Sequence, residues 1–511
     1  MSQLCIRIWA ITAVALAAAV TPDGADKSGK VTIRVVEKSS GEVVPSRIHL
    51  TDEAGKPQRA AGLPFWHDHF VCPGSVTLEL PPGKYTYEVE RGPEYPTSAG
   101  ELTVRAGAEQ QVTVPLVRLA NMSAQGWWSG ELHVHRPLED VELLMRAEDL
   151  HVAPAISWWN DRNVWQNRAL PDEPLVRFDG DRFYQRMGGE DEREGGALLF
   201  HNLHRPLKIT GSTREYPSPM KFVEQARQQE GAWIDIEKPF WWDVPVWLAS
   251  GQVNSIGIAN NHMCRSQMYE TEAWGKPRDA TRLPPPLGNG YWTQEIYYHI
   301  LNCGLRIPPA AGSASGVLPN PVGYNRVYVY LGDKIDYDAW WEGLREGRSF
   351  VTNGPLLRVP ANGHMPGHVF TAPAGQEFKV DLFIDLISRD PIKVVKIIKN
   401  GRVERSVTSE DWSKTDSLGS LTFNESGWFL VRALADNPKT YRFASTAPYY
   451  VEIGDARRRV SRASAQFFLD WVKERMQRIK LADPDQRQEV LSHHEQAQRF
   501  WEARVASANA P

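Results

Sequence analysis

Apolar and polar residues alternate in short runs through the first hundred residues after the N-terminus. The runs VTIRVVE, SVTLELPPGKYTYEVE and GELTVRAG follow a period of two, and Gly, Pro and Asp residues separate them. On a strand this period places successive side chains on opposite faces, and short strands with regular turn signals are typical of an antiparallel sandwich. The pattern therefore predicts an N-terminal β-sandwich over residues 30–119.

Strand-like and helix-like patterns alternate in the middle of the chain. Apolar runs such as HVAPAIS, GALLFHNL, AWIDIE, NSIGIAN and YNRVYVYL are separated by stretches with helical spacing, among them VELLMRAEDL, PMKFVEQARQQE, WTQEIYYHILNCG and YDAWWEGLREG. Strands that alternate with helices predict an α/β fold with a mostly parallel sheet, whose functional residues lie at the carboxyl ends of the strands. We therefore predict an α/β domain over residues 122–355.

Strand patterns return after this segment and give way to helical spacing at the C-terminus. The runs FKVDLFIDLI, IKVVKIIKNG, GWFLVRALA and APYYVEIG predict a second β-sandwich over residues 356–456. Residues 461–511 carry apolar positions at helical spacing on both sides of Asp483 and a following proline, which together form a helix-start signal. This predicts a helical hairpin, with His493 and His494 on its solvent side.

The extreme N-terminus has the pattern of a secretion signal. A single positive charge at Arg7 precedes an apolar run over residues 8–20, and small and polar residues follow. The run is too short to span a bilayer comfortably, and no second apolar segment follows it. We predict a signal peptide over residues 1–25, a periplasmic or secreted mature protein, and no membrane span after cleavage.

Composition narrows the classes of partner and the covalent chemistry. A formal net charge of −4 at pH 7 gives no indication of nucleic-acid binding. Outside the signal, Cys72, Cys264 and Cys303 form no C-x-x-C pair, so we expect neither a disulfide framework nor a thiolate zinc cluster. The 19 tryptophans, several of them in adjacent pairs, favour core packing over exposed platforms for sugars.

Candidate chemistry begins at GELHVHRPLED, residues 130–140. On a strand, Glu131, His133 and His135 share one face while Leu132 and Val134 share the other. Two imidazoles therefore point toward one place, as a metal site requires. A polar edge strand whose histidines face water is an equally acceptable interpretation of this spacing alone.

The same segment resembles the opening motif of the PHP (polymerase and histidinol phosphatase) metallohydrolases, and the nearest branch is the CehA/McbA-like group of secreted or periplasmic hydrolases. LREGRSFVTNGPLL resembles the closing segment of that group, and the N-terminal module resembles prealbumin-like or carboxypeptidase-regulatory-like domains. The resemblance implies a PHP-like distorted β/α barrel flanked by two β-sandwiches and the helical hairpin. It also implies zinc, manganese or iron, and further ligands at Asp140, Glu190 of RMGGED, and His201 of ALLFHNL, with His204 as the alternative to His201.

Several positions depart from the family pattern. Trp159 of SWWN and Lys238 of IEKP stand where histidine ligands are expected, and GSASG places Ala314 and Gly316 where an aspartate and a histidine would bind metal. About half of the multinuclear ligand set is therefore missing.

Two functional interpretations follow. In the first, a reduced metal site hydrolyses an ester, amide, carbamate or phosphoester of a small molecule or glycan through a metal-activated water. Glu237 or His262 would complete the site, and Glu131 would orient a histidine. Lys238 or Arg265 would stabilise the oxyanion, and Glu237 or Asp161 would move the proton.

In the second interpretation the domain is inactive and binds carbohydrate or another partner. Its pocket would be lined by aromatic faces and amides: Trp158, Trp159, Trp241, Trp242, Asn160 and Asn260. The polar-aromatic segment 260–325 is either a binding surface or a structural cover, and His67, Asp68 and His69 belong either to a loop tip facing the next domain or to a surface turn.

Overall fold

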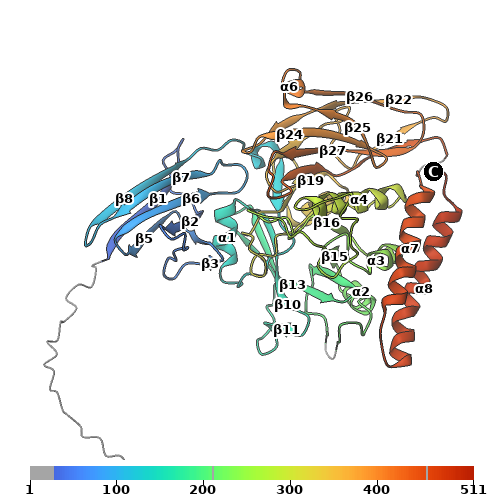
Figure 1. Ribbon diagram of the computed structural model, residues 1–511, viewed down its shortest axis with the longest axis horizontal. Coiled ribbons are helices and arrows are strands. Elements are labelled where there is room, and N and C mark those ends of the chain that lie inside the picture. The colour runs from blue at the N-terminus through green and yellow to red at the C-terminus, as the bar shows by residue number, and fades with distance from the viewer. Residues whose placement is uncertain (1–27, 210–211, 456–457) are drawn as a thin grey trace, which may run out of the picture.

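The computed structural model describes residues 28–209, 212–455 and 458–511, which form 29 β-strands, eight α-helices and one 3-10 helix. Figure 1 shows the N-terminal sandwich on the left, the C-terminal sandwich at the top and a central part below it. The predicted signal peptide lies outside the described residues. None of the helices in these ranges is long and apolar enough to cross a membrane.

The N-terminal part consists of two sheets that share one core. The strand orders are β5-β1-β8 and β3-β4-β2-β6-β7. The strand bounds are β1 Gly29–Glu37, β2 Ser46–Asp52, β3 Phe65–Trp66, β4 His69–Cys72, β5 Ser75–Leu80, β6 Gly83–Glu90, β7 Ser98–Val104 and β8 Glu109–Leu116. Val31 and Ile33 of β1 are fully buried in the same cluster as Ile48 and Leu50 of β2. The apolar residues that alternate along these strands therefore face the space between the two sheets and form this core.

The central part is built on a mixed sheet in the order β18-β9-β10-β13-β14-β15-β16-β17. The strand bounds are β9 Trp127–Gly130, β10 Val152–Trp159, β11 Arg162–Asn163, β12 Leu175–Phe178, β13 Arg182–Arg193, β14 Gly196–His201, β15 Trp233–Ile236, β16 Ser255–Ala259, β17 Pro309–Ala311 and β18 Arg326–Tyr330. The helices are η1 Ser123–Gln125, α1 Val141–Glu148, α2 Met220–Arg227, α3 Val244–Ser250, α4 Gly288–Asn302 and α5 Tyr337–Arg345.

The predicted α/β class and the PHP-like β/α barrel are wrong. Strands outnumber α-helices 29 to eight in the described chain, and β13 pairs antiparallel with β14, as β14 does with β15 and β18 with β9. Only Glu194 and Gly195 join β13 to β14, whereas parallel neighbours need a crossover of about a dozen residues. The run GALLFHNL therefore pairs antiparallel with its neighbours on both sides, whereas β15, β16 and β17 pair parallel with one another.

The C-terminal part continues the sheet of the central part without a break. Strand β19 pairs antiparallel with β18 on one side and with β28 on the other. The bounds here are β19 Ser349–Thr352, β20 Leu356–Arg358, β21 Val369–Ala372, β22 Phe378–Phe383, β23 Asp385–Ile387, β24 Ile392–Lys399, β25 Arg402–Val407, α6 Ser409–Trp412, β26 Ser417–Phe423, β27 Gly427–Ala435, β28 Phe443–Thr446 and β29 Tyr449–Ile453. The side chains of β21–β29 that point inward form a second β core.

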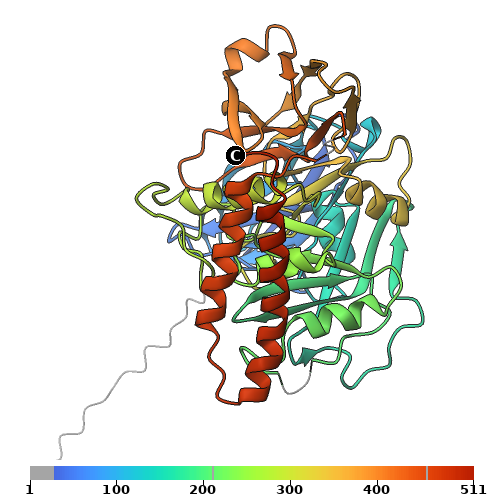
Figure 2. The ribbon, with the colours of Figure 1, turned by 90° about the vertical axis from the view of Figure 1, so that its right-hand side faces the viewer.

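Two long helices close the chain and lie side by side against the central part (Figure 2). They are α7 Arg462–Arg478 and α8 Pro484–Ala506, and the Asp483 side chain caps α8 by accepting from the backbone N–H groups of Asp485 and Gln486 at 2.9 and 3.1 Å. His494 is fully buried instead of facing solvent, with its Nε2 3.2 Å from Oδ1 of Asp243. Arg475 pairs with the same carboxylate at 2.7 Å, so both helices are attached to α3 through Asp243.

Candidate metal centre

The two histidines of the HVH segment lie where the extended chain continues beyond β9. Leu132 and Val134 are buried on the opposite face, and Val134 bridges Ala155 on one side and Ser315 on the other. Because the segment is held between two neighbours, the rings of His133 and His135 project from a fixed backbone.

The segment 312–316 approaches both histidines so closely that only glycine fits at its two ends. A Cβ built on Gly312 would lie 2.4 Å from Cβ of His133, and one built on Gly316 would lie 2.3 Å from the carbonyl oxygen of His135. Gly316 also has a φ of +101°, which side chains with a Cβ rarely adopt. Close packing thus explains the glycine at a position where the resemblance would place a ligand.

Three ligand atoms converge on one point. Nε2 of His133 and Nε2 of His135 are 2.9 Å apart, and Oε2 of Glu190 lies 3.0 Å from the second and 3.5 Å from the first. Metal–ligand bonds of about 2.0–2.2 Å in tetrahedral geometry place ligand atoms roughly 3.4 Å apart, so this triangle has the size of one face of such a site. The set of two imidazoles and one carboxylate, all largely buried, can hold a divalent metal ion.

The carboxylate of this group is held in its charged form. Burial alone would raise the pKa of Glu190, but the charges and hydrogen bonds of His133 and His135 outweigh burial and hold that pKa well below its usual range. For His135, burial dominates and lowers the pKa. For His133, burial is outweighed by the charges of Glu190 and Glu237, which raise the pKa. His135 therefore favours the neutral form that metal binding requires, whereas a metal ion would have to displace a proton from His133.

Glu237 lies on the Nδ1 side of His133. Its Oε1 is 3.5 Å from Nδ1 of His133, which leaves Nε2 of that ring for the triangle. Glu237 also accepts from Nδ2 of Asn261 at 2.7 Å and from Nε1 of Trp241 at 2.8 Å, and it pairs with Lys238. Glu237 and Lys238, which were both predicted to be catalytic, are therefore paired within a buried network of hydrogen bonds and ion pairs. Nζ of Lys238 lies 4.6 Å from the ring centroid of Trp241.

Glu131 is buried but does not hydrogen-bond either histidine. It accepts from the backbone N–H of Ser313 at 2.6 Å and from that of Gly323. Burial raises the pKa of Glu131 to about 7, against these hydrogen bonds. This residue therefore fastens the 313–323 segment beside the site instead of orienting an imidazole.

His201 lies next to the ligand group without belonging to it. It is fully buried, and neither ring nitrogen has a hydrogen-bond partner. Burial lowers the pKa of His201 to about 3, and the charge of His133 adds to that effect. An unpaired buried N–H costs on the order of 1–3 kcal/mol, so the environment of His201 is consistent with a group that binds beside it. The alternative, His204, is exposed.

Four predicted residues do not join the group. Asp140 stands at the N-cap position of α1 without a side-chain capping hydrogen bond, and its Oδ2 lies 3.7 Å from Nη2 of Arg136. Asp161 is exposed and makes no contact with the ligands. Nδ1 of His262 lies 3.1 Å from the carbonyl oxygen of Thr271, with its ring against Phe240 and Tyr269. Arg265 pairs with Glu88 and with Glu90 of β6, at 3.0 Å for the latter, so it binds the N-terminal sandwich and not an oxyanion.

The sequence pattern also missed a neighbour of the site. Glu192 follows Glu190 by two residues on β13, so both point to the same side of the strand. Burial, followed by the charges of Glu190 and Glu237, raises the pKa of Glu192 to about 8. The period of two along GGEDE could have shown from the sequence that Glu192 lies on the same side of the strand as Glu190.

The predicted tryptophan-lined pocket for carbohydrate does not form. Trp158, Trp241 and Trp242 are each at most 2% exposed and belong to the main core. Trp159 is partly exposed, but its ring packs against His135 with centroids 5.2 Å apart. These indoles therefore shape the core around the metal ligands.

A second donor group lies in the N-terminal sandwich. Oδ2 of Asp68 is 3.3 Å from Nδ1 of His49, and Oδ1 is 2.9 Å from Nδ1 of His69. Nε of Arg47 donates to Nε2 of His49 at 3.2 Å, which places the proton of a neutral His49 on Nδ1, facing Asp68. The carboxylate of Asp68 therefore bridges two imidazole N–H groups. His67 and Asp68 form the turn between β3 and β4, with His67 exposed, so the surface-turn interpretation fits these two residues, whereas His69 is buried.

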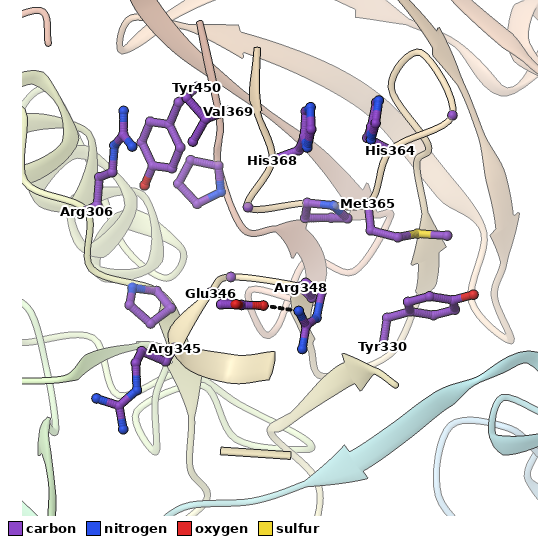
Figure 3. A pocket seen from close by; sticks show the side chains of 16 residues that line it. Arg306, Tyr330, Arg345, Glu346, Arg348, His364, Met365, His368, Val369 and Tyr450 are labelled. Atoms are coloured by element: carbon purple, nitrogen blue, oxygen red, sulfur yellow. Dashed lines mark hydrogen bonds and ion pairs between the residues drawn. The ribbon is translucent and has the colours of Figure 1, made fainter. Parts of the chain in front are cut away.

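A pocket of about 800 Å³ lies far from these ligands in the chain, between the central part and the C-terminal sandwich (Figure 3). His364 and His368 stack at its rim with ring centroids 3.7 Å apart. Three arginines line it and each pairs with a glutamate: Arg306 with Glu452, Arg345 with Glu342, and Arg348 with Glu346. These cations are neutralised within the protein, which weakens the pocket as an anion site.

Comparisons with known proteins place the chain in no family. No family model matches it, and no curated protein matches it. Among the solved structures that match short segments are the Bacillus anthracis TIE protein, with 18% identity over 22% of this chain and a TM-score of 0.15, and the pilus-presented adhesin Cpa, with 14% identity over 18% of this chain and a TM-score of 0.14. The matched segments span only 20% and 27% of those proteins, and similarities this weak carry no argument about fold or function.

Proposed function

We propose that this protein is an exported, metal-dependent hydrolase of ester, amide, carbamate or phosphoester bonds. The observation that carries the proposal is the triangle formed by Nε2 of His133, Nε2 of His135 and Oε2 of Glu190. Two histidines and one carboxylate are a donor set of catalytic zinc sites, and manganese or iron also accept it.

The surrounding residues support a hydrolytic role. A divalent ion at this position supplies Lewis-acid polarisation of the scissile group and activation of water near neutral pH. Glu237 orients His133 through Nδ1, and the aromatic ring of Trp159 covers one side of His135. The likeness of HVH to the PHP opening motif agrees with this ligand set, although family membership stays a prediction, and the apolar run over residues 8–20 supports export.

Elemental analysis tests the proposal directly. We expect the full chain, purified without chelator, to carry about one equivalent or more of zinc, manganese or iron, and the His133→Ala/His135→Ala double variant to carry none. His204→Ala is the matched control, because that histidine is exposed and three residues from His201. A parent that stays metal-free after incubation with all three ions would refute the proposal.

Activity assays follow in the same proteins. A panel of esters, amides, carbamates and phosphoesters, with and without a remote anionic group, is expected to show metal-dependent turnover in the parent and in His204→Ala, and at least about 10³-fold less in the double variant. Carbohydrate binding has no comparable support, because the indoles expected to form its platform are buried.

A further inference from the structure

A pocket of about 540 Å³ lies beside the metal ligands, between the N-terminal sandwich and the central part. His135 forms part of its wall, together with Arg136 and Asp140 from the central part. The opposite wall comes from the N-terminal sandwich and includes Arg59 and Trp66. The pocket therefore connects a predicted metal ligand with a module that contributes no atom to the ligand triangle.

The two parts of the pocket are fixed to each other. Nε1 of Trp66 donates to the carbonyl oxygen of Leu318 at 2.8 Å, and Nη2 of Arg136 donates to the carbonyl oxygen of Phe65 at 3.3 Å. Strand β4, which follows this wall, packs against α1, and Figure 1 shows β3 beside that helix. The walls thus keep a constant separation, as a preformed binding site requires.

Two arginines give the pocket an excess of positive charge. The guanidinium of Arg59 is exposed, lies 4.0 Å from the ring centroid of Phe65, and has no carboxylate partner within ion-pair distance in the described residues. Arg136 is 6% exposed, and its contact with Asp140 is long, at 3.7 Å. One carboxylate therefore faces two guanidinium groups, and Arg59 is free to pair with a ligand.

We propose that this pocket binds an oxyanion group of the substrate, a carboxylate, sulfate or phosphate remote from the scissile bond, through Arg59 and Arg136. The inference rests on the proposed function, because His135 would be the point at which the substrate meets the metal. The N-terminal sandwich then serves as a specificity module. Substrates that carry such a group are held at one end by Arg59 while the bond to be broken lies at the ligand triangle.

Titration calorimetry with succinate, phosphate and sulfate as separate probes tests the inference on the full chain, with metal and after chelation. We expect one of the three anions to bind the parent, and Arg59→Gln to weaken that binding at least about tenfold. Arg402→Gln, at an exposed arginine of β25 in the other sandwich, should change it less than twofold. The anion that binds identifies the oxyanion class.

The outcomes separate this inference from the proposed function. A metal-loaded parent that binds none of the three anions, or an Arg59→Gln variant that binds as tightly as the parent, overturns the pocket and leaves the hydrolase standing. A parent that binds an anion through Arg59 but takes up no metal supports the pocket and overturns the hydrolase. Because Arg59 is exposed and makes no ion pair in the described chain, its replacement should leave the fold intact, which the unfolding temperature will check.

Discussion

Glu90 of the N-terminal sandwich and Arg389 of the C-terminal sandwich, 299 residues apart in sequence, form an ion pair of 3.4 Å between Oε1 and Nη1. The same carboxylate pairs with Arg47 of β2 and with Arg265 of the central part. Burial would raise the pKa of Glu90, but these arginines hold it well below its usual range. One buried carboxylate thus joins all three β-rich parts.

Replacing this carboxylate should destabilise the whole protein. We expect Glu90→Gln to lower the free energy of unfolding by about 3–5 kcal/mol, because the buried Arg47 would keep its charge with one partner fewer. Urea unfolding measures the change. Glu88→Gln is the control, since its side chain is 48% exposed and an exposed ion pair contributes about 0–1 kcal/mol. Equal effects of the two substitutions would contradict a joining role for Glu90.

Glu237 should influence metal affinity without touching the metal. Because its Oε1 faces Nδ1 of His133, we expect Glu237→Gln to weaken metal binding about 10–100-fold, as measured by competition with a chelator. Glu230→Gln, at an exposed position, should have no effect. A variant that binds metal as tightly as the parent would show that His133 is positioned by its backbone alone.

Gly316 should be required for the placement of His135. We expect Gly316→Ala to reduce metal binding at least about tenfold, because the new methyl group would collide with the carbonyl oxygen of His135. Gly363→Ala is the matched control: its φ of +79° is also in the left-handed region, but no atom lies within 4 Å of its Cβ position. If both variants keep their metal, the close approach has no bearing on the site.

His151 should make the protein sensitive to mild acid. Burial lowers the pKa of His151 to about 3, with a ring nitrogen 3.0 Å from Oγ of Ser129. The unfolded chain, with a pKa of about 6.5, takes up the proton more readily, so the free energy of unfolding falls as the pH drops from 6.5 toward 3.

A variant without this imidazole isolates its contribution. Between pH 7 and pH 5 we expect His151→Gln to lose about 2 kcal/mol less unfolding free energy than the parent. His204→Ala, at an exposed histidine, should follow the parent. Parallel pH profiles for the parent and His151→Gln would show that His151 titrates normally in the fold.

The local pattern around HVH could be read from the sequence, whereas the fold could not. A period of two correctly puts Leu132 and Val134 on a buried face, with His133 and His135 together on the other. It could not show that β13 and β14 form a hairpin in place of successive βα units, although the two-residue connection contained that information.

Long-range pairing explains the misplaced site residues. Arg265 lies in the polar-aromatic segment 260–325 and resembles a catalytic cation in sequence, yet its partners Glu88 and Glu90 lie more than 170 positions earlier in the chain. Likewise, His262 satisfies Nδ1 with the backbone of Thr271. A sequence pattern records the chemical type of a side chain but not the distant group that neutralises it.

Strand β19 has a bearing on how this protein can be divided. Since it forms ladders with β18 and β28 at once, a truncation near residue 355 would leave the backbone groups of one partner strand open to pairing with other molecules. Fragments that end or begin there are expected to aggregate. In the intact chain, the central and C-terminal parts should unfold together in a single cooperative transition. The central and C-terminal parts are therefore one folding unit. A recombination event that replaced only one of them with the corresponding part of another protein would break the ladders of β19.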